Sequence, residues 1–556
     1  MKKYLFPLFI IGFVLFSLAP SIYELSRSGD LQPNREFELI HNFPTDYNFY
    51  LSRIREGLEG RWTVTEKYTS EPHAGSYIHE LYLLMGKAGA WARVPWGRAG
   101  DIYHVARIVL AFALLISISE FCKRSFVKAQ HSFWVFTAFL FAVTASSWPK
   151  FVAVVGGSIV PVTSDTIQNL RFGGYMAWWS VMDSLQRITF IPHLLAGQVL
   201  ITILILLVTQ GSLLHTKSTP IFVGILAFIL GMVFPPGLIF VYTVMAIWIV
   251  LSGKKLSYWI VPYGAIVAIS LPSLIYLFLM TGMYPWKRLS QVDIIRPLPF
   301  DYLEYARALG PMLPLGLAGL VVVLWVWEAS LLPAVAWVLS WGLLLGVFAF
   351  VPQQSPLRFS EMIPHVPLGT LAAYFLYSLS TRIPRRMIEA AAVLLIGMGV
   401  FHMYSSYLWQ RDFVDHKIRA TLPLVPTGSY VMYPMKDFIL AMKYLEDVTK
   451  GNGVILSETT AGNYMPVYSG NTVYAGHDNT VAFEAKQEKV KEFFSGTMEK
   501  NTVKSWISDM NAAYVFYGPQ EREDGGPKDL SALYPFLREV YKNSIVTIYR
   551  VLPDAL

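Results

Sequence analysis

Long apolar runs separated by short polar segments are the feature that most constrains how this chain can fold. About eleven of these runs approach the length of a membrane-spanning helix, which needs roughly 20 residues. Of the 556 residues, 54% are hydrophobic and 15% are charged, and the charges lie mostly between the runs. A soluble protein cannot bury so much apolar surface, and charges within hydrocarbon are costly. The chain is therefore predicted to be a polytopic α-helical membrane protein of about 11 transmembrane helices, at 4–23, 105–122, 133–148, 191–210, 220–235, 238–251, 259–281, 311–327, 331–351, 367–379 and 388–407.

Two apolar segments need separate interpretations. The first run follows Lys2 and Lys3, which is the layout of a secretory signal. Its length permits a span, and Pro20 disfavours cleavage after Ala19, so we expect an uncleaved first helix rather than a cleaved signal peptide. The stretch 151–160 is too short to cross a bilayer and is expected to be a re-entrant or interfacial segment.

Basic residues determine the predicted orientation. If the N-terminus is cytoplasmic, alternate short loops that carry Lys and Arg all fall on the cytoplasmic side, as the positive-inside rule requires. Loops 24–104 and 149–190, and everything after 407, then lie outside. The expected location is a plasma or inner membrane, with an extracytoplasmic C-terminal domain. The basic residues on the cytoplasmic side include Lys123, Arg124, Lys217, Lys254, Lys255, Arg382, Arg385 and Arg386.

The C-terminal part of the chain has a different pattern. From about residue 425 the hydropathy falls, and helix and strand signals alternate. This pattern predicts a transmembrane domain over 1–424, with a large first outer loop at 24–104, and a small α/β domain over 425–556. The expected helices are 436–448, 484–494 and 502–509, and the expected strands are 453–457, 472–476, 513–517 and 545–551.

Several functional classes are disfavoured. No Walker phosphate-binding loop, Gly-rich dinucleotide fingerprint or His-Glu-x-x-His sequence is present, which argues against an ATP-driven pump, a nucleotide-sugar enzyme and a zinc hydrolase. A single cysteine, Cys122, excludes an internal disulfide and a Cys-based metal cluster. The net charge of +7 is explained by basic loops at the membrane, so no nucleic-acid partner is expected.

The first outer loop contains the strongest candidate for chemistry. Asp46 begins the segment Asp-Tyr-Asn-Phe-Tyr-Leu-Ser-Arg, which ends at Arg53 and combines an acid, aromatic rings and an arginine just outside the membrane. Such an acid is placed to act as a general base or to hold a metal ion. The alternative is structural, because Thr45 or Asp46 is equally suited to cap a helix N-terminus.

This segment resembles the first-loop motif of the GT-C superfamily of membrane glycosyltransferases. That family includes the catalytic subunits of oligosaccharyltransferases and the aminoarabinose and mannosyl transferases, which take a sugar from a polyprenyl phosphate or diphosphate. The resemblance implies that Asp46 is the catalytic base and that Arg53 lies at the substrate or acceptor cleft.

The resemblance extends to three further segments. Glu71 and His73, in Glu-Pro-His-Ala-Gly-Ser, resemble the later part of the same loop and imply a role in positioning substrate, although a surface loop is the alternative. His477 ends a stretch that resembles a Gly-His strand end of the C-terminal domains, where it would contact the acceptor unless it is structural. Asp165 stands alone where oligosaccharyltransferases carry a paired acidic motif that helps to bind a divalent cation. The resemblance therefore leaves Mg²⁺ or Mn²⁺ dependence open, and its ligands unknown.

Basic residues outside the membrane are the candidates for donor binding. Arg358 is the only basic residue of its short outer loop, and Glu361 follows three residues later. A guanidinium there can hold a phosphate bidentately, or it can be anchored among lipid headgroups. This loop resembles the arginine-containing loop of bacterial GT-C proteins, which implies a phosphate role, with Glu361 orienting Arg358. Lys287 and Arg288 form a second outward basic cluster that is suited to a lipid phosphate or to headgroups.

Together these features predict an inverting membrane glycosyltransferase. It would transfer a sugar from a polyprenyl-phosphate donor to a lipid, glycan or protein acceptor on the outer face of the membrane. The alternatives are a transporter or flippase of lipid-linked glycans and a non-catalytic membrane scaffold. Transporters tend to carry ionisable or helix-breaking residues at mid-membrane in related halves, and here Pro235-Pro236 has no matching partner.

Overall fold

The computed structural model describes residues 5–126, 132–155, 158–160, 162–295, 297–351, 354–426, 432–525 and 529–552. The chain forms two compact units, which are described separately below. The helical unit comprises Met1–Tyr23, Val105–Leu277 and Asp293–Val414. The mixed unit comprises Glu24–His104, Phe278–Val292 and Asp415–Leu556.

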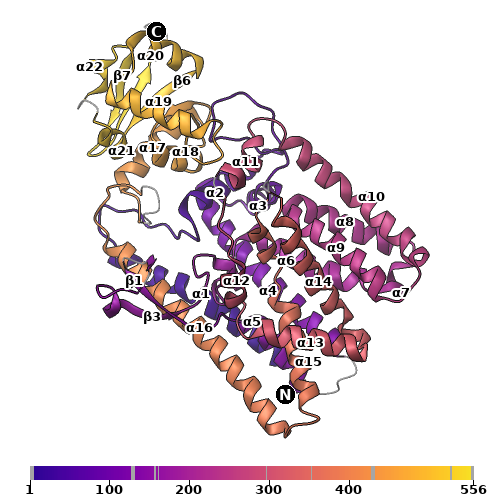
Figure 1. Ribbon diagram of the computed structural model, residues 1–556. Helices are drawn as coiled ribbons and strands as arrows, with labels where there is room; N and C mark the ends of the chain where they lie inside the picture. The colour runs from indigo at the N-terminus through magenta and orange to yellow at the C-terminus, as the bar shows by residue number, and fades with distance from the viewer. Residues whose placement is uncertain are drawn as a thin grey trace. The chain divides into compact units, whose positions relative to one another are not determined.

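Each predicted span coincides with a helix of the structure, which confirms the polytopic helical architecture (Figure 1). By length and composition, five helices in the described part of the chain can cross a membrane, or six if α12 (Tyr302–Ala308) and α13, bent by 87°, form one span. Four other apolar helices, α5, α6, α8 and α9, are shorter, so the number of spans stays a prediction. The helices at the predicted spans are α1 (Leu5–Ser26), α4 (Ala99–Ser125), α5 (Ser132–Thr144), α6 (Pro192–Val208), α8 (Thr219–Val233), α9 (Pro235–Leu251), α10 (Leu256–Met280), α13 (Met312–Val326), α14 (Leu332–Phe348), α15 (His365–Leu379) and α16 (Arg385–Arg419).

Close helix packing in the helical unit centres on α15, which packs against both α5 and α13. On α13, a Cβ at Gly319 would clash with the carbonyl oxygen of Leu371 on α15. On α15, a Cβ at Gly369 would lie 2.7 Å from the backbone nitrogen of Ala142 on α5. Glycines at these positions let the helix backbones approach closely. Close packing of this kind stabilises helix association in a membrane, because the surrounding lipid is as apolar as the side chains and the hydrophobic effect does not favour contact between helices.

In the apolar stretch 151–160, the described residues 151–155 and 158–160 lie in strands, and a location at the membrane interface stays a prediction. β1 (Lys150–Val155) pairs antiparallel with β2 (Ser158–Val160) on one side and with β3 (Leu170–Gly173) on the other. A run of this length has too few residues for a helical span, and its β-branched residues favour strands. Pairing with β3 satisfies backbone groups that the apolar stretch cannot satisfy alone.

The mixed unit contains a five-stranded sheet in the order β5-β4-β6-β8-β7. The first three strands are parallel, and β8 pairs antiparallel with β6 and β7. Helices cover both faces: α17 and α18 contribute to one hydrophobic core, and α19 and α20 contribute to the other. The strands are β4 (Val454–Leu456), β5 (Thr472–Val473), β6 (Ala512–Tyr517), β7 (Leu537–Lys542) and β8 (Thr547–Val551), and the helices are α17 (Lys436–Thr449), α18 (Thr459–Tyr468), α19 (Phe483–Ser495), α20 (Lys500–Asp509), α21 (Pro519–Glu523) and α22 (Leu530–Leu533).

The expected elements of the C-terminal region are present, and two principal elements were not anticipated. Helix α18 contains Pro466 and precedes a glycine, which obscured its helical pattern. Strand β7 has the sequence Leu-Arg-Glu-Val-Tyr-Lys, which lacks the strict hydrophobic alternation that identifies a strand.

The first outer loop packs with the C-terminal region inside the mixed unit. The amide of Val473 in the edge strand β5 donates to the carbonyl of Lys67 at 2.9 Å, so one backbone hydrogen bond joins the loop to the sheet. Tyr68 is fully buried in the same core as Phe438 of α17. The loop 24–104 contributes two helices, α2 (Pro44–Leu58) and α3 (Glu80–Trp91).

This packing changes the predicted domain division. Segments 24–104 and 278–292 belong to the compact unit that contains the C-terminal domain, although they were assigned to the transmembrane domain 1–424. That unit also begins at 415 rather than 425 in its last segment. Hydropathy separates apolar from polar segments, but it does not reveal which distant polar segments fold together.

Candidate functional site

Asp46 lies in the first turn of α2. Pro44 occupies the first helical position, where its missing N–H costs no hydrogen bond, and the N-cap residue is Phe43. The capping alternative for Thr45 and Asp46 is therefore wrong: the cap residue is Phe43, with no side-chain capping bond. The side chain of Asp46 is 45% exposed, and the helix N-terminus favours a negative charge at this position.

His477 binds the carboxylate of Asp46. Its Nε2 lies 3.3 Å from Asp46 Oδ1, while its Nδ1 accepts a hydrogen bond from the amide of Asn479 at 3.2 Å. Because Nδ1 is the acceptor, the proton of a neutral imidazole is assigned to Nε2, which then donates to Asp46. The ring is 7% exposed and stacks on Phe49 with the centroids 4.5 Å apart. The structure thus brings together two predicted site residues that are far apart in the sequence.

Hydrogen bonds to α18 fix the turn that carries Asp46. Asn48 Nδ2 donates to Asn463 Oδ1 at 2.9 Å, and Asn463 Nδ2 donates to the carbonyl of Thr45 at 3.2 Å. The hydroxyl of Tyr68 donates to the carbonyl of Asn463 at 3.2 Å. A site residue that is supported in this way is held in place before any substrate arrives.

Sequence reasoning missed these supporting residues. Asn48 and Phe49 belong to the first-loop motif, but nothing in the sequence indicates that they support Asp46 and His477. The sequence around Asn463 does not indicate a role for this residue, because its hydrogen bond with Asn48 forms only when α2 and α18 pack together.

Arg288 is predicted to bind the donor phosphate, but its side chain forms hydrogen bonds within the mixed unit. Its Nε donates to the carbonyl of Asp478 at 2.8 Å, and its Nη2 donates to Glu484 Oε1 at 2.8 Å. The side chain is 7% exposed. Arg288 therefore holds the loop that follows His477. Lys287 is half-buried, with its Nζ 5.4 Å from the ring centroid of Tyr284.

Glu71 and His73 stabilise the first outer loop. Glu71 Oε1 lies 2.7 Å from Lys486 Nζ. Burial would raise the pKa of Glu71, but hydrogen bonds from Lys486 and Thr69 outweigh burial and lower it. His73 accepts from the amide of Glu66 at 2.8 Å and donates from Nδ1 to the carbonyl of Glu71 at 2.7 Å. Both ring nitrogens of His73 are thus occupied by backbone groups, which favours the structural alternative.

Arg53 is enclosed in the interior of the mixed unit. Its Nη2 lies 2.7 Å from Glu66 Oε2, and the two side chains are 0% and 2% exposed. The guanidinium also lies 4.2 Å from the ring centroid of Phe49. Arg53 therefore stabilises the packing of α2. Because its side chain is buried, the structure gives no support to the predicted contact with an acceptor.

Arg358 lies in the helical unit on the 3₁₀ helix η8 (Pro356–Glu361) that follows α14. Its side chain is 34% exposed, and its Nη1 lies 3.9 Å from Glu361 Oε1. Glu361 is 1% exposed, and its carbonyl accepts from Gln198 Nε2 at 3.1 Å. The structure thus places the partly exposed Arg358 beside a buried acid, and the phosphate-binding and orienting roles stay predictions.

Asp165 is exposed in a turn of the helical unit. It accepts a hydrogen bond from Ser164 at 3.3 Å. This geometry gives Asp165 no specific partner that would single it out as a site residue.

Solved structures provide the only matches. No protein-family model and no curated protein matches the chain. The oligosaccharyltransferase of Archaeoglobus fulgidus, tethered to an acceptor peptide, is 12% identical with a TM-score of 0.51, covering 93% of this chain and 69% of that one. ArnT from Cupriavidus metallidurans, bound to undecaprenyl phosphate, is 10% identical with a TM-score of 0.49, covering 96% and 97%. The chain has the GT-C fold.

The described residues contain no preformed set of metal ligands. Across the ranges that the structure describes, no three His, Cys, Asp or Glu side chains group closely enough to hold an ion. Asp46 contacts His477, whose ring nitrogens are both engaged. The dependence on Mg²⁺ or Mn²⁺ stays a prediction.

Proposed function

We propose that this chain is a membrane glycosyltransferase that moves a sugar from a polyprenyl-phosphate carrier to a lipid, glycan or protein acceptor on the outer face of the membrane. One observation carries the proposal: in a GT-C fold, the half-exposed carboxylate of Asp46 is held by His477 at the start of α2. A carboxylate that is accessible and fixed has the properties of a general base. The similarity to an oligosaccharyltransferase studied with an acceptor peptide makes a peptide one acceptor class to test.

Asp46 takes a proton in the proposed reaction. As an acceptor hydroxyl or amide attacks the anomeric carbon, its proton passes to the carboxylate of Asp46. The bond between the anomeric carbon and the phosphate oxygen breaks, and the phosphate leaves with the electron pair. A single displacement of this kind inverts the configuration at the anomeric carbon.

His477 acts as a positioning residue. Its Nε2–H donates to Asp46 Oδ1, which leaves the second carboxylate oxygen to receive the proton. Stacking on Phe49 and the amide of Asn479 fix the ring, and the ring in turn fixes the carboxylate.

Arg358 is the residue that we propose for the donor phosphate. Its guanidinium neutralises the negative charge that grows on the leaving phosphate, and it can do so through two parallel hydrogen bonds. We assign Glu361 the role of orienting Arg358, and the support for this role is that its buried carboxylate lies 3.9 Å from Arg358 Nη1. Arg288 is not assigned to the phosphate because its side chain already holds Asp478 and Glu484.

Transfer of a labelled sugar tests the proposal. Membranes that contain the parent chain are given labelled polyprenyl-phosphate sugars, together with lipid and peptide acceptors. The variant Asp46→Asn should lower transfer by roughly 10³, whereas Asp30→Asn, which alters an exposed carboxylate paired with Arg27, should not change it. Equal transfer by the parent and Asp46→Asn would refute the role of Asp46.

Donor binding is tested separately. Arg358→Gln should raise the KM for the donor, while Arg98→Gln, at an exposed arginine paired with Asp101, should leave it unchanged. If the parent moves labelled lipid across vesicles but transfers no sugar, the flippase alternative replaces the transferase.

A further inference from the structure

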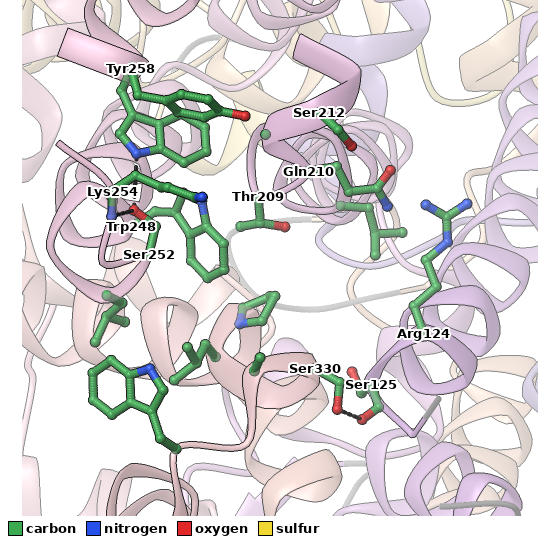
Figure 2. Close-up of a pocket in the computed structure, with 18 of the residues that line it drawn as sticks. Arg124, Ser125, Thr209, Gln210, Ser212, Trp248, Ser252, Lys254, Tyr258 and Ser330 are labelled. Carbon is green, nitrogen blue, oxygen red and sulfur yellow. Dashed lines mark hydrogen bonds between the residues drawn. The ribbon is translucent and has the colours of Figure 1, made fainter. Parts of the chain in front are cut away.

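The helical unit contains a cavity of about 550 Å³ that the proposed reaction does not use. It lies where several helices end or begin: the last turn of α4, the segments after α6 and α9, the start of α10 and the connection from α13 to α14. We refer to it as the interfacial cavity. Figure 2 shows its wall residues around one open space.

The interfacial cavity combines cations, aromatic rings and hydroxyl groups. Its two cationic residues are Arg124, at the end of α4, and Lys254, between α9 and α10. Figure 2 shows Arg124 on one side of the space and Lys254 with the aromatic rings on the other. The other polar and aromatic lining residues include Ser125, Thr209, Gln210, Ser212, Trp248, Ser252, Tyr258, Trp259, Trp327 and Ser330.

Internal hydrogen bonds hold the walls of the interfacial cavity. Trp259 Nε1 donates to the hydroxyl of Ser252 at 3.0 Å, and the hydroxyl of Ser330 donates to the carbonyl of Ser125 at 3.0 Å. The latter bond joins α4 to the segment that precedes α14. Because these bonds connect different helices, the cavity is built into the fold and is not a gap between loose side chains.

The composition of the cavity matches the headgroup level of a bilayer. Trp and Tyr are enriched at membrane–water interfaces, where one part of the ring is apolar and the other is wet. The loops that follow α4, α6 and α9 at the cavity carry basic residues used to predict the cytoplasmic side. Juxtamembrane Lys and Arg attract anionic lipids.

Arg124 already has a partner, but a weak one. Its Nε donates to Glu120 Oε1 at 2.8 Å, and both side chains are more than 40% exposed. Exposed pairs of this kind contribute little. An anion can therefore bind the terminal amines of the guanidinium while Glu120 keeps its contact with Nε.

We propose that the interfacial cavity binds the phosphorylated headgroup of an anionic membrane lipid, with Arg124 and Lys254 contacting the phosphate and the aromatic wall contacting the glycerol and upper acyl region. The volume is within the range of small-molecule sites, roughly 300–1,000 Å³. The site is separate from Arg358. Leu332 and Pro333 at the start of α14 line the cavity, whereas Arg358 follows the end of that helix, about 25 Å away at 1.5 Å per residue.

Lipid binding to the full chain tests this proposal. The purified protein is titrated with nanodiscs or mixed micelles that contain phosphatidylglycerol or phosphatidylcholine, and bound lipid is counted by native mass spectrometry. The double variant Arg124→Gln/Lys254→Gln should bind phosphatidylglycerol about tenfold more weakly, with phosphatidylcholine binding unchanged.

A matched control separates the cavity from a general basic surface. Lys123→Gln/Lys255→Gln removes the same charge from the adjacent positions, which do not line the cavity. The control should keep the parent's affinity for phosphatidylglycerol. Equal loss in both double variants, or no loss in either, would overturn the proposal.

A third variant blocks the space without changing any charge. Ser212 is an exposed lining residue, and Ser212→Trp should also weaken phosphatidylglycerol binding while the melting temperature stays that of the parent. Unchanged binding would place the lipid elsewhere. Inorganic phosphate or glycerol phosphate at millimolar concentration should not displace the lipid, and displacement by either would identify a soluble phosphate as the ligand instead.

Discussion

Two turns of the same helix, α2, have opposite characters. Asp46, in its first turn, is half-exposed and is held by one contact at 3.3 Å. Arg53, two turns later, is fully buried and bonded to Glu66 at 2.7 Å. The accessible charge can exchange a proton with a substrate, whereas the enclosed charge can only support the fold. Proximity to a motif acid therefore does not indicate a functional role.

Exchanging Asp46 for Asn gives the largest expected effect and tests the accessible side of this comparison. Asp46→Asn should lower the turnover number by roughly 10³, because general-base catalysis contributes about 10²–10⁴. The melting temperature should stay within a degree or so of the parent, since only one exposed contact changes. A loss of activity that follows a loss of folded protein would contradict the assignment of Asp46 to chemistry.

Replacing Arg53 tests the buried half of this comparison, the ion pair between Arg53 and Glu66. Arg53→Met leaves the Glu66 carboxylate buried without its partner, and the free energy of unfolding should fall by about 3–5 kcal/mol. Thermal or denaturant unfolding of the full chain in detergent measures this change. Arg53→Met/Glu66→Leu should lose less than the single variant, because no charge is left uncompensated. Arg27→Met, at an exposed pair, should cost less than about 1 kcal/mol.

Two buried carboxyl groups of the mixed unit, Glu458 and Glu521, predict how the stability of the protein depends on pH. Burial raises the pKa of Glu458 to about 8, helped by its hydrogen bond with Asp524, and burial raises the pKa of Glu521 to about 7. Both values exceed the usual 4.5, so the folded state holds protons that the unfolded state releases. This stabilisation is complete below about pH 4.5 and is lost as the pH rises through 7 to 8.

The melting temperature of the full chain should therefore be lower at pH 9 than at pH 6. Glu458→Gln should remove about 2 kcal/mol of that difference, because the amide does not titrate. Glu523→Gln, at an exposed neighbour, is the control and should keep the parent's profile. A parental profile in Glu458→Gln would show that Glu458 is ionised in the folded state.

The smallest expected effect is that of replacing His477, and it shows whether this residue positions Asp46 or itself transfers the proton. His477→Ala should lower the turnover number about tenfold while leaving the KM for the donor unchanged, because Asp46 keeps its carboxylate but loses its orientation. His477→Gln can still donate a hydrogen bond and should recover part of the rate. A loss as large as that of Asp46→Asn would make the imidazole itself the base.

The chemical type of the site was more predictable than its surroundings. Asp46 and His477 were each identified through a resemblance, but nothing in the sequence paired them. Arg288 carried the signature of a phosphate ligand, an outward basic residue, and only its contacts with Asp478 and Glu484 show that it supports the fold.

The sequence by itself determined the apolar helices and the change to an α/β pattern near residue 425, because both depend on local composition and periodicity, whereas the candidate acid came from a resemblance to a known family. Only the tertiary structure decided that segment 24–104 folds with the C-terminal region, that Arg53 is enclosed and that His477 binds Asp46. Contacts between residues hundreds of positions apart depend on how chain segments pack in space, and packing leaves no periodic signal in a single sequence.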